Sequence, residues 1–110
     1  MPKEVYLIQA NDLSLYKIGV SENSKKRVKK LQTGCPYELE ILYVFKSKFP
    51  FKVEKMLHNK HASRKRNIDN DILKGEWFNL ETNQILKFLK DCQEAEDKIL
   101  FLKEAGNPFI

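Results

Sequence analysis

The sequence predicts an α+β domain in which a small sheet is flanked by helices and followed by a long C-terminal helix. Two β-prone runs stand first, and helical and β-prone runs alternate after them. Turn and capping residues separate these runs, and no repeat or low-complexity tract interrupts them. Because 110 residues fit one domain, we expect a single domain over residues 1–110, with a core at 5–80 and a helical extension at 81–110.

The chain opens with a predicted β-hairpin. Val5–Ala10 and Leu15–Val20 are short runs rich in branched and aromatic residues, as strands usually are. Between them, Asn11–Ser14 supplies side chains that hydrogen-bond to their own backbone and so favour a turn. Two strands joined by so short a connection are expected to pair antiparallel.

A basic helix is expected after the hairpin. Ser21, Asn23 and Ser24 are all candidate N-caps, because their side-chain oxygens can accept from unpaired amides of a first helical turn. Gly34 suits the position just past the helix end, where a left-handed backbone is common. Only a narrow apolar face interrupts the lysines of this segment, so most of its surface should meet solvent.

The middle of the chain predicts a strand and a second helix. Glu38–Phe45 alternates as a strand does, and Pro50 suits the first turn of a helix over Phe51–Ala62. The polar run Ser63–Lys74 is expected to be a loop. The inward positions expected on this helix are Val53, Met56, Leu57 and either Asn59 or Lys60.

The last third predicts a short strand and a long helix. Gly75–Leu80 is aromatic and β-prone, and Thr82 is the expected N-cap of the helix that follows. Apolar residues then recur at roughly helical spacing, with a break expected near Glu94–Asp97.

Positive charge is concentrated in the first two-thirds of the chain. The formal net charge is +5. Residues 17–33 carry six basic residues against one acid, and residues 46–66 carry eight against one, whereas residues 81–110 carry four lysines against six acids. This asymmetry is typical of a protein that binds a phosphate backbone. We therefore expect a nucleic-acid partner.

Several classes of protein are disfavoured by composition. Cys35 and Cys92 are far apart and form no CxxC pair, which favours free buried thiols over a zinc knuckle or a disulfide framework. No stretch approaches the roughly 20 apolar residues that a membrane span needs, and the N-terminus lacks the apolar core of a secretion signal. We expect an intracellular protein without membrane contact.

Residues suited to phosphodiester cleavage are spread over three predicted elements. The reaction needs a base to activate water, a cation for the growing phosphate charge, and a carboxylate if a metal takes part. The hairpin offers Tyr6 and either Tyr16 or Lys17, and the later helices offer a cation and a carboxylate with a neighbouring imidazole, namely Arg27, Glu54 and His58.

These residues stand in an order that resembles the GIY-YIG endonuclease superfamily, in the branch founded on a phage T5 open reading frame. The resemblance covers about Val5 to Leu80 and rests on the following segments: Val5–Ile8, Tyr16–Gly19, Arg27, Leu31–Gly34 with Pro36, Glu54 with Leu57 and His58, and Gly75–Phe78. The resemblance implies a small, mostly antiparallel, three-stranded sheet and metal-dependent hydrolysis of phosphodiester bonds in nucleic acid, with DNA the expected substrate. Its implied cofactor is Mg²⁺ or Mn²⁺.

The resemblance also implies a role for each matched residue. Tyr6 would lie beside the attacking water, Gly19 would allow the backbone to approach the catalytic helix, and Arg27 would hold the phosphate. Glu54 would bind the metal. Lys17 stands where the motif's name has tyrosine, and a lysine there could hold the nucleophile or act as base if its pKa is depressed.

Some roles stay open on the sequence alone. His58 could assist the base, touch phosphate or be a satisfied polar residue. A zinc site built from Glu54, His58 and His61 fits the spacing but is disfavoured, since three ligands along one helix seldom converge on one metal.

The predicted nucleic-acid-binding surface contacts the backbone and reads no base sequence. Its members are Tyr16, Gly19, Lys25, Lys26, Lys29, Lys30, Arg64, Lys65 and Arg66. Two alternatives to an enzyme remain: a nucleic-acid-binding module that cuts little or nothing, and a module whose basic face meets an acidic protein. The chain is expected to be a monomer or a homodimer.

Overall fold

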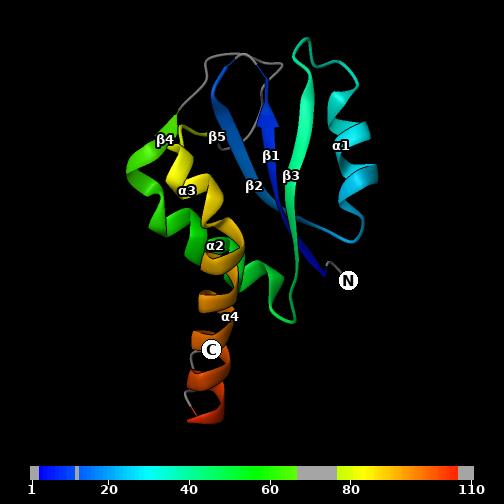
Figure 1. Ribbon diagram of the computed structural model, residues 1–110. Helices are drawn as coiled ribbons and strands as arrows, with labels where there is room; N and C mark the ends of the chain where they lie inside the picture. The colour runs from blue at the N-terminus through cyan, green and yellow to red at the C-terminus, as the bar shows by residue number, and fades with distance from the viewer. Residues whose placement is uncertain (1–2, 12, 67–76, 107–110) are drawn as a thin grey trace.

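The computed structural model describes residues 3–11, 13–66 and 77–106, which form an α+β fold with an open antiparallel sheet (Figure 1). The strand order is β3-β1-β2-β5-β4. The strands are β1 (Glu4–Ala10), β2 (Leu15–Ser21), β3 (Leu39–Lys46), β4 (Lys65–Arg66) and β5 (Trp77–Phe78). The helices are α1 (Ser24–Gln32), α2 (Pro50–Lys60), the short 3-10 turn η1 (Ala62–Arg64), α3 (Thr82–Leu86) and α4 (Phe88–Glu104).

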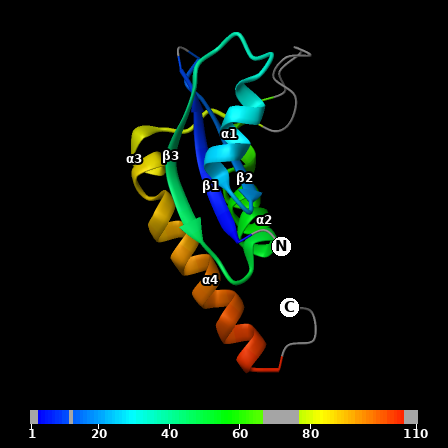
Figure 2. The same cartoon turned by 90° about the vertical axis from the view of Figure 1, so that its right-hand side faces the viewer.

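Both faces of the central strand β1 are buried, because helices cover the sheet on its two sides (Figures 1 and 2). Val5 and Leu7 point into a core formed with α2 and α4. Tyr6 and Ile8 alternate with them and point into a second core, against which α1 packs Val28. The sheet therefore separates two apolar layers. Successive residues of one strand point to opposite faces of the sheet and so belong to different layers.

The two edges of β2 have different partners. Along its inner edge β2 pairs with β1 over its full length. Along its outer edge, among the described residues, Tyr16 pairs with Phe78 of β5. Beyond that point, within the described residues, the Ile18 carbonyl accepts a hydrogen bond from a helix instead of a strand, at 2.8 Å from His58 Nε2.

Local chemistry sets both ends of α1. Asn23 is the N-cap, and its Oδ1 accepts from the Lys26 amide at 3.1 Å. The Ser24 amide and hydroxyl both donate to Glu4 Oε1, at 2.9 and 2.7 Å, so the first turn is fixed to β1. Gly34 follows the helix with φ of +81°, the left-handed conformation expected from its position.

The Gln32 side chain joins the end of α1 to the start of β3. Its Nε2 donates to the Tyr37 carbonyl at 2.8 Å and to the Cys35 carbonyl at 3.3 Å. Its Oε1 accepts from the Leu39 amide at 2.8 Å. One amide side chain thus satisfies backbone groups on both sides of the connection, which holds α1 against the sheet.

Polar contacts hold the long helix α4 against the rest of the fold at two places along its length. Glu96 Oε1 accepts from the Ser47 hydroxyl at 2.6 Å and from the Lys48 amide at 2.7 Å, next to the end of β3. One end of α4 holds the buried Asp91, which pairs with Lys60 at 2.8 Å at the end of α2. None of the helices in the described ranges is both long and apolar enough to cross a membrane.

The structure confirms the α+β class, the antiparallel sheet and the long C-terminal helix, and it corrects several details. The sheet has five strands where three were expected, because the two-residue strands β5 and β4 extend it. Strand β4 lies in the segment expected to be a loop. It forms because Arg64 and Asn79 exchange hydrogen bonds, the Asn79 amide to the Arg64 carbonyl and Arg64 Nε to the Asn79 carbonyl, both at 2.8 Å.

The helical boundaries near the C-terminus also differ from expectation. Glu81, not Thr82, is the N-cap, because Glu81 and Gln84 form a reciprocal capping box. The helical run breaks at Lys87 between α3 and α4, whereas Glu94–Asp97 continues without interruption inside α4. Asn59 and Lys60, offered as inward positions of α2, are exposed. Gly75 and Glu76 of the predicted aromatic strand lie outside the described residues.

The two cysteines are free, as expected, but only one of them is fully buried. Cys92 lies in the core between the sheet and α4, and burial raises its pKa to about 12. Cys35 is partly exposed. Cys92 is therefore an inert core thiol.

We predict that Gln32→Ala lowers the free energy of unfolding by ~2 kcal/mol, because three backbone groups lose their partner. Urea unfolding followed by circular dichroism measures the change. The matched control is Gln93→Ala, which removes only an exposed contact with Asp97 on α4 and should change stability by less than about 0.5 kcal/mol. Equal effects of the two substitutions would contradict the structural role given to Gln32.

Candidate active site

A cavity of about 420 Å³ opens beside β2. Ile18, Gly19 and Val20 of β2 line it, and so does Phe51 of α2. All five residues predicted to be catalytic line it: Tyr6, Lys17, Arg27, Glu54 and His58. Residues separated by up to 52 positions in the sequence are thus brought around one open space.

Three parts of the fold meet at this cavity. The hairpin β1–β2 contributes Tyr6 and Lys17. Helix α1 contributes Arg27 from one side of the sheet, and α2 contributes Glu54 and His58 from the other. The hydrogen bond from His58 Nε2 to the Ile18 carbonyl holds α2 at this edge of β2, so side chains of both helices can converge there.

Tyr6 and Gly19 face each other across the hairpin and are in close contact. They are direct partners in the β1–β2 register, and Tyr6 is only 2% exposed. A Cβ atom added to Gly19 would overlap the Tyr6 hydroxyl and Cζ and would lie 2.9 Å from Cε1. Gly19 is therefore required by space, since the tyrosine ring occupies the volume that any other side chain would need.

The Tyr6 hydroxyl is held in its protonated form and lies beside Arg27. Burial raises the pKa of Tyr6 above its ordinary value, and the hydrogen bond and positive charge of Arg27 oppose this effect without cancelling it. At neutral pH the phenol therefore keeps its proton and can donate it in a hydrogen bond. Arg27, which is exposed, also has donors available on the cavity side.

The pKa of Lys17 is lower than that of an ordinary surface lysine. Burial lowers the pKa of Lys17, the positive charge of Arg27 lowers it further, and Glu54 opposes both effects. Its Nζ lies 5.7 Å from the centre of the Trp77 ring, whose face attracts a cation. Lys17 can therefore lose its proton more readily than a solvated lysine while remaining in a fixed position.

His58 fixes α2 to the edge of β2. Because the Ile18 carbonyl can only accept, Nε2 must carry the proton in their 2.8 Å hydrogen bond. The ring also packs edge-on against Phe78, with 5.1 Å between ring centres. Glu54 stands one helical turn earlier, so the histidine contact determines how close the carboxylate lies to β2.

The comparison with protein families agrees with this arrangement. A family model described as the T5orf172 domain matches residues 4–93. The chain belongs to the T5orf172 domain family. This family is named for a phage T5 open reading frame and is grouped with GIY-YIG-like nucleases, as expected from the motif order. No curated protein and no solved structure matches the chain.

The donor set of this T5orf172 domain fits a magnesium ion better than a zinc ion. Within the described residues no group of three or more His, Cys, Asp or Glu side chains gathers as a metal site. Glu54 is half-buried and lines the cavity. Mg²⁺ commonly binds through one or two carboxylates and completes its shell with water and substrate phosphate, so Glu54 is a residue that could hold such an ion.

The zinc alternative finds no support in the described part of the chain. His61 is 4% exposed and lines a different, smaller cavity with Lys60 and Asp91. Burial lowers the pKa of His61. Its position away from Glu54 and His58 removes the third ligand that a zinc site would need.

The predicted nucleic-acid-binding residues do not all lie together. Lys26, Lys29 and Lys30 line a second cavity of about 530 Å³ on α1, and Arg27 lines both this cavity and the candidate site. Lys25 is exposed on the same helix, and Gly19 lines the candidate site. Arg27 therefore connects the basic cavity of α1 with the candidate site in this T5orf172 domain.

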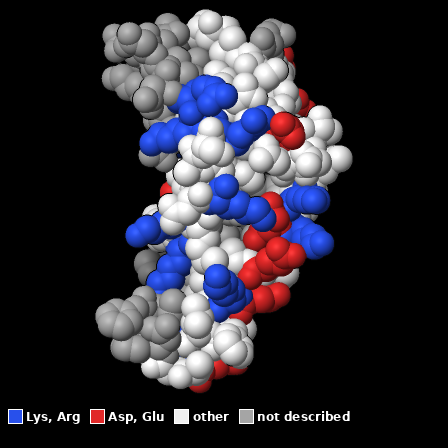
Figure 3. Space-filling view, turned by 90° about the vertical axis from the view of Figure 1, so that its left-hand side faces the viewer, with Lys and Arg blue, Asp and Glu red and all other residues white. Residues whose placement is uncertain are grey.

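The remaining members lie elsewhere. Tyr16 is 7% exposed in the core behind the sheet, and its hydroxyl accepts from Gln9 Nε2 at 3.4 Å. Arg64 supports β5 through the Asn79 carbonyl and lies 3.4 Å from Glu81. Lys65 and Arg66 are exposed on β4 at the sheet edge. Figure 3 shows that this end of the molecule is basic, whereas acidic residues gather in a band along α4.

Sequence reasoning missed Phe51 as a residue of this site and missed the contact that Trp77 makes there. Trp77 is a core residue with 3% exposure, and the Lys17 ammonium lies over its ring. Phe51 lines the candidate cavity one helical turn before Glu54. The spacing of three residues was visible in the sequence and would have placed both side chains on one face of the helix.

We predict that Gly19→Ala destabilises the protein by about 1–3 kcal/mol, since the new methyl group overlaps the Tyr6 ring. In a Tyr6→Leu background the clashing atoms are absent, so Gly19→Ala should cost much less there. A double-mutant cycle by urea unfolding measures this coupling. Additive effects of the two substitutions would show that the close contact does not exist.

Proposed function

We propose that this T5orf172 domain is a metal-dependent endonuclease that hydrolyses phosphodiester bonds in DNA. Membership in the T5orf172 family supports a nuclease-like or nucleic-acid-binding domain. The observation that carries the endonuclease proposal is the convergence of Tyr6, Lys17, Arg27 and Glu54 on one open cavity. These are a hydrogen-bond donor, an activated amine, a planar cation and a carboxylate, the set that hydrolysis requires.

Arg27 is the residue that holds the scissile phosphate in this proposal. Its planar fork can donate two parallel hydrogen bonds to phosphate oxygens, which the neighbouring lysines cannot do. The charge that grows on phosphate during attack strengthens this contact, so Arg27 stabilises the transition state more than the bound substrate. The lysines of α1 raise the local concentration of the polyanion around it.

Lys17 is the proposed proton acceptor, and Tyr6 is the proposed positioning donor. The lowered pKa of Lys17 makes its neutral amine more available near neutral pH, and the raised pKa of Tyr6 keeps the phenol protonated, so Lys17 is the group that can accept a proton. A water oxygen attacks phosphorus, its proton passes to the neutral amine of Lys17, and the bond from phosphorus to the leaving oxygen breaks. Tyr6 donates a hydrogen bond that holds the water or the phosphate during this step.

Glu54 would hold the metal ion in the cavity. When bound, Mg²⁺ or Mn²⁺ supplies positive charge that stabilises the leaving oxygen. His58 keeps α2 against β2, and it therefore sets the position of that carboxylate without itself meeting the substrate.

A binding module without catalysis is the second candidate, and the basic surface of α1 favours it. Lys26, Lys29 and Lys30 surround a cavity beside Arg27 and could hold a phosphate backbone by charge alone. Such a protein would bind DNA with an affinity that falls steeply with salt. It would not cut DNA in any metal.

We predict that the protein nicks supercoiled plasmid in Mg²⁺ and that Glu54→Gln and Arg27→Lys each lower the rate by at least about 100-fold. Arg27→Lys keeps the charge and removes the fork. The matched control is Glu94→Gln, an exposed carboxylate on α4, which should retain the wild-type rate. Salt-sensitive binding by wild type without nicking in Mg²⁺ or Mn²⁺ would establish the binding module.

We predict that kcat/KM for nicking rises with pH along a limb that lies below the ordinary lysine pKa of about 10.4. The sign follows from the lowered pKa of Lys17, because the neutral amine that accepts the proton becomes more abundant as pH rises. Lys17→Arg should remove this limb, since arginine stays protonated throughout the range. A limb that persists unchanged in Lys17→Arg would assign the base to another group.

A further inference from the structure

Phe51 is an exposed aromatic residue at the mouth of the candidate site. It stands in the first turn of α2 directly after Pro50, and 61% of its surface is accessible. Single exposed apolar residues are common on proteins and carry no meaning alone. Phe51 differs from them because it lines two cavities, one of which is the candidate site.

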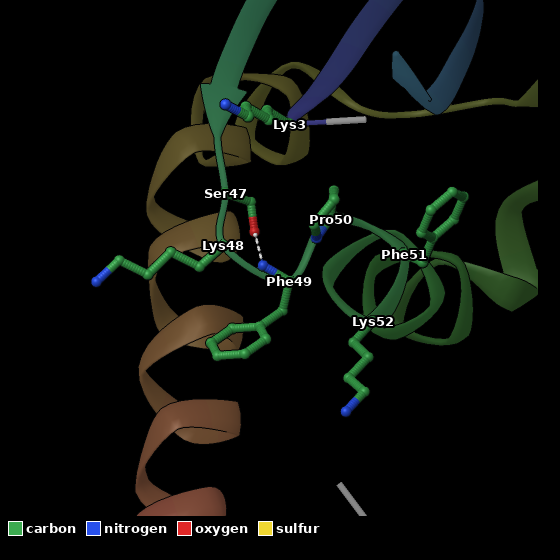
Figure 4. Close-up of a pocket in the computed structure, with 7 residues that line it drawn as sticks. All are labelled: Lys3, Ser47, Lys48, Phe49, Pro50, Phe51 and Lys52. Atoms are coloured by element: carbon green, nitrogen blue, oxygen red, sulfur yellow. Dashed lines mark hydrogen bonds between the residues drawn. The ribbon is translucent and has the colours of Figure 1, made fainter. Parts of the chain in front are cut away.

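The second cavity lies on the other side of Phe51 and has a volume of about 540 Å³. Phe49, Pro50 and Phe51 give it apolar walls, and three lysines, Lys3, Lys48 and Lys52, stand around them. Figure 4 shows the Phe49 and Phe51 rings on opposite sides of Pro50, with Lys48 and Lys52 extending away from the chain.

The two rings of this cavity are not equally available to a ligand. Lys103 of α4 places its Nζ 5.1 Å from the centre of the Phe49 ring, so that ring already has a cation over it. Phe49 is also partly buried against the core, whereas Phe51 is exposed. Phe51 therefore offers the open aromatic surface.

An aromatic surface bordered by ammonium groups suits one kind of ligand, a planar base that is attached to phosphate. Every nucleobase can stack on a phenylalanine ring, and the neighbouring lysines can meet its phosphates. Bases paired within a continuous duplex keep their faces stacked on one another and cannot reach such a ring. The surface thus favours an unpaired nucleotide.

We infer that Phe51 forms a base-stacking subsite for an unpaired nucleotide next to the phosphate that Arg27 holds. The inference rests on the proposed function and adds the structural class of the substrate. Because Phe51 and Glu54 stand three residues apart on α2, the base and its neighbouring phosphate reach two adjacent positions of one helix. The preferred substrate is a single strand, a flap or a loop, and continuous duplex binds less tightly.

The test is a binding titration without divalent metal, so that it does not depend on cleavage. A single-stranded oligonucleotide with one 2-aminopurine is compared with the same sequence as a duplex. Phe51→Ala should weaken single-strand binding by about tenfold and abolish the stacking-induced quenching of 2-aminopurine. Phe51→Trp should retain both signals, and duplex binding should change by less than about twofold in either variant.

Phe101→Ala is the matched control, because Phe101 is 69% exposed on α4 and lines neither cavity. It should bind single strands as the wild type does. The inference is overturned if Phe51→Ala binds single strands normally, or if it weakens single-strand and duplex binding equally. It is also overturned if Phe51→Ala only lowers the sedimentation mass, because the ring then belongs to a contact between two copies of the chain.

The subsite and the proposed hydrolysis can fail separately. Nicking in Mg²⁺ with no effect of Phe51→Ala on single-strand binding would leave hydrolysis standing and remove the subsite. Phe51-dependent single-strand binding without nicking in any metal would support the subsite and remove hydrolysis.

Discussion

The hydrogen bond from His58 Nε2 to the Ile18 carbonyl holds α2 against β2, and the rest of the candidate site depends on this contact. Backbone carbonyls of a strand must find hydrogen-bond partners. Here the Ile18 carbonyl finds one in a side chain of α2. Helices from both sides of the sheet can then direct Arg27 and Glu54 into the same space.

Burial shifts the pKa values of the two proton-carrying groups of the site, Tyr6 and Lys17, in opposite directions. Tyr6 and Lys17 lie near each other and near Arg27, yet burial raises the pKa of the phenol and lowers that of the amine. Burial disfavours the charged form in each case, so both groups tend toward neutrality. A neutral phenol can donate a hydrogen bond and a neutral amine can accept a proton, so burial alone gives the two residues complementary roles.

Local chemistry explains which parts of the fold the sequence could predict. Asn23 and Gly34 set the ends of α1 through contacts within a few residues, and both were visible as capping signals. Strand β4 was not visible, because two residues cannot show a period and its hydrogen bonds join Arg64 to Asn79 across the fold. The capping box of Glu81 and Gln84 sets the start of α3 through residues three positions apart.

The candidate site likewise has residues that the sequence could predict and residues that it could not. Tyr6, Gly19, Arg27 and Glu54 stand in motifs whose order can be followed along the chain, so their convergence could be anticipated. Tyr16 stands in such a motif too, but alternation along β2 points its side chain to the other face of the sheet, where it lies in the core. The exposure of Phe51 depends on how far the neighbouring chain covers α2, which no local pattern encodes.

The most direct measurement of the central claim is a crystal structure with a short single-stranded oligonucleotide and Ca²⁺ in place of the active metal. We expect a phosphate group hydrogen-bonded to Arg27 at the β2 edge, with the cation between that phosphate and Glu54. An oligonucleotide bound only along the outer lysines of α1 or along β4, with the cavity at Tyr6 and Lys17 vacant, would contradict it.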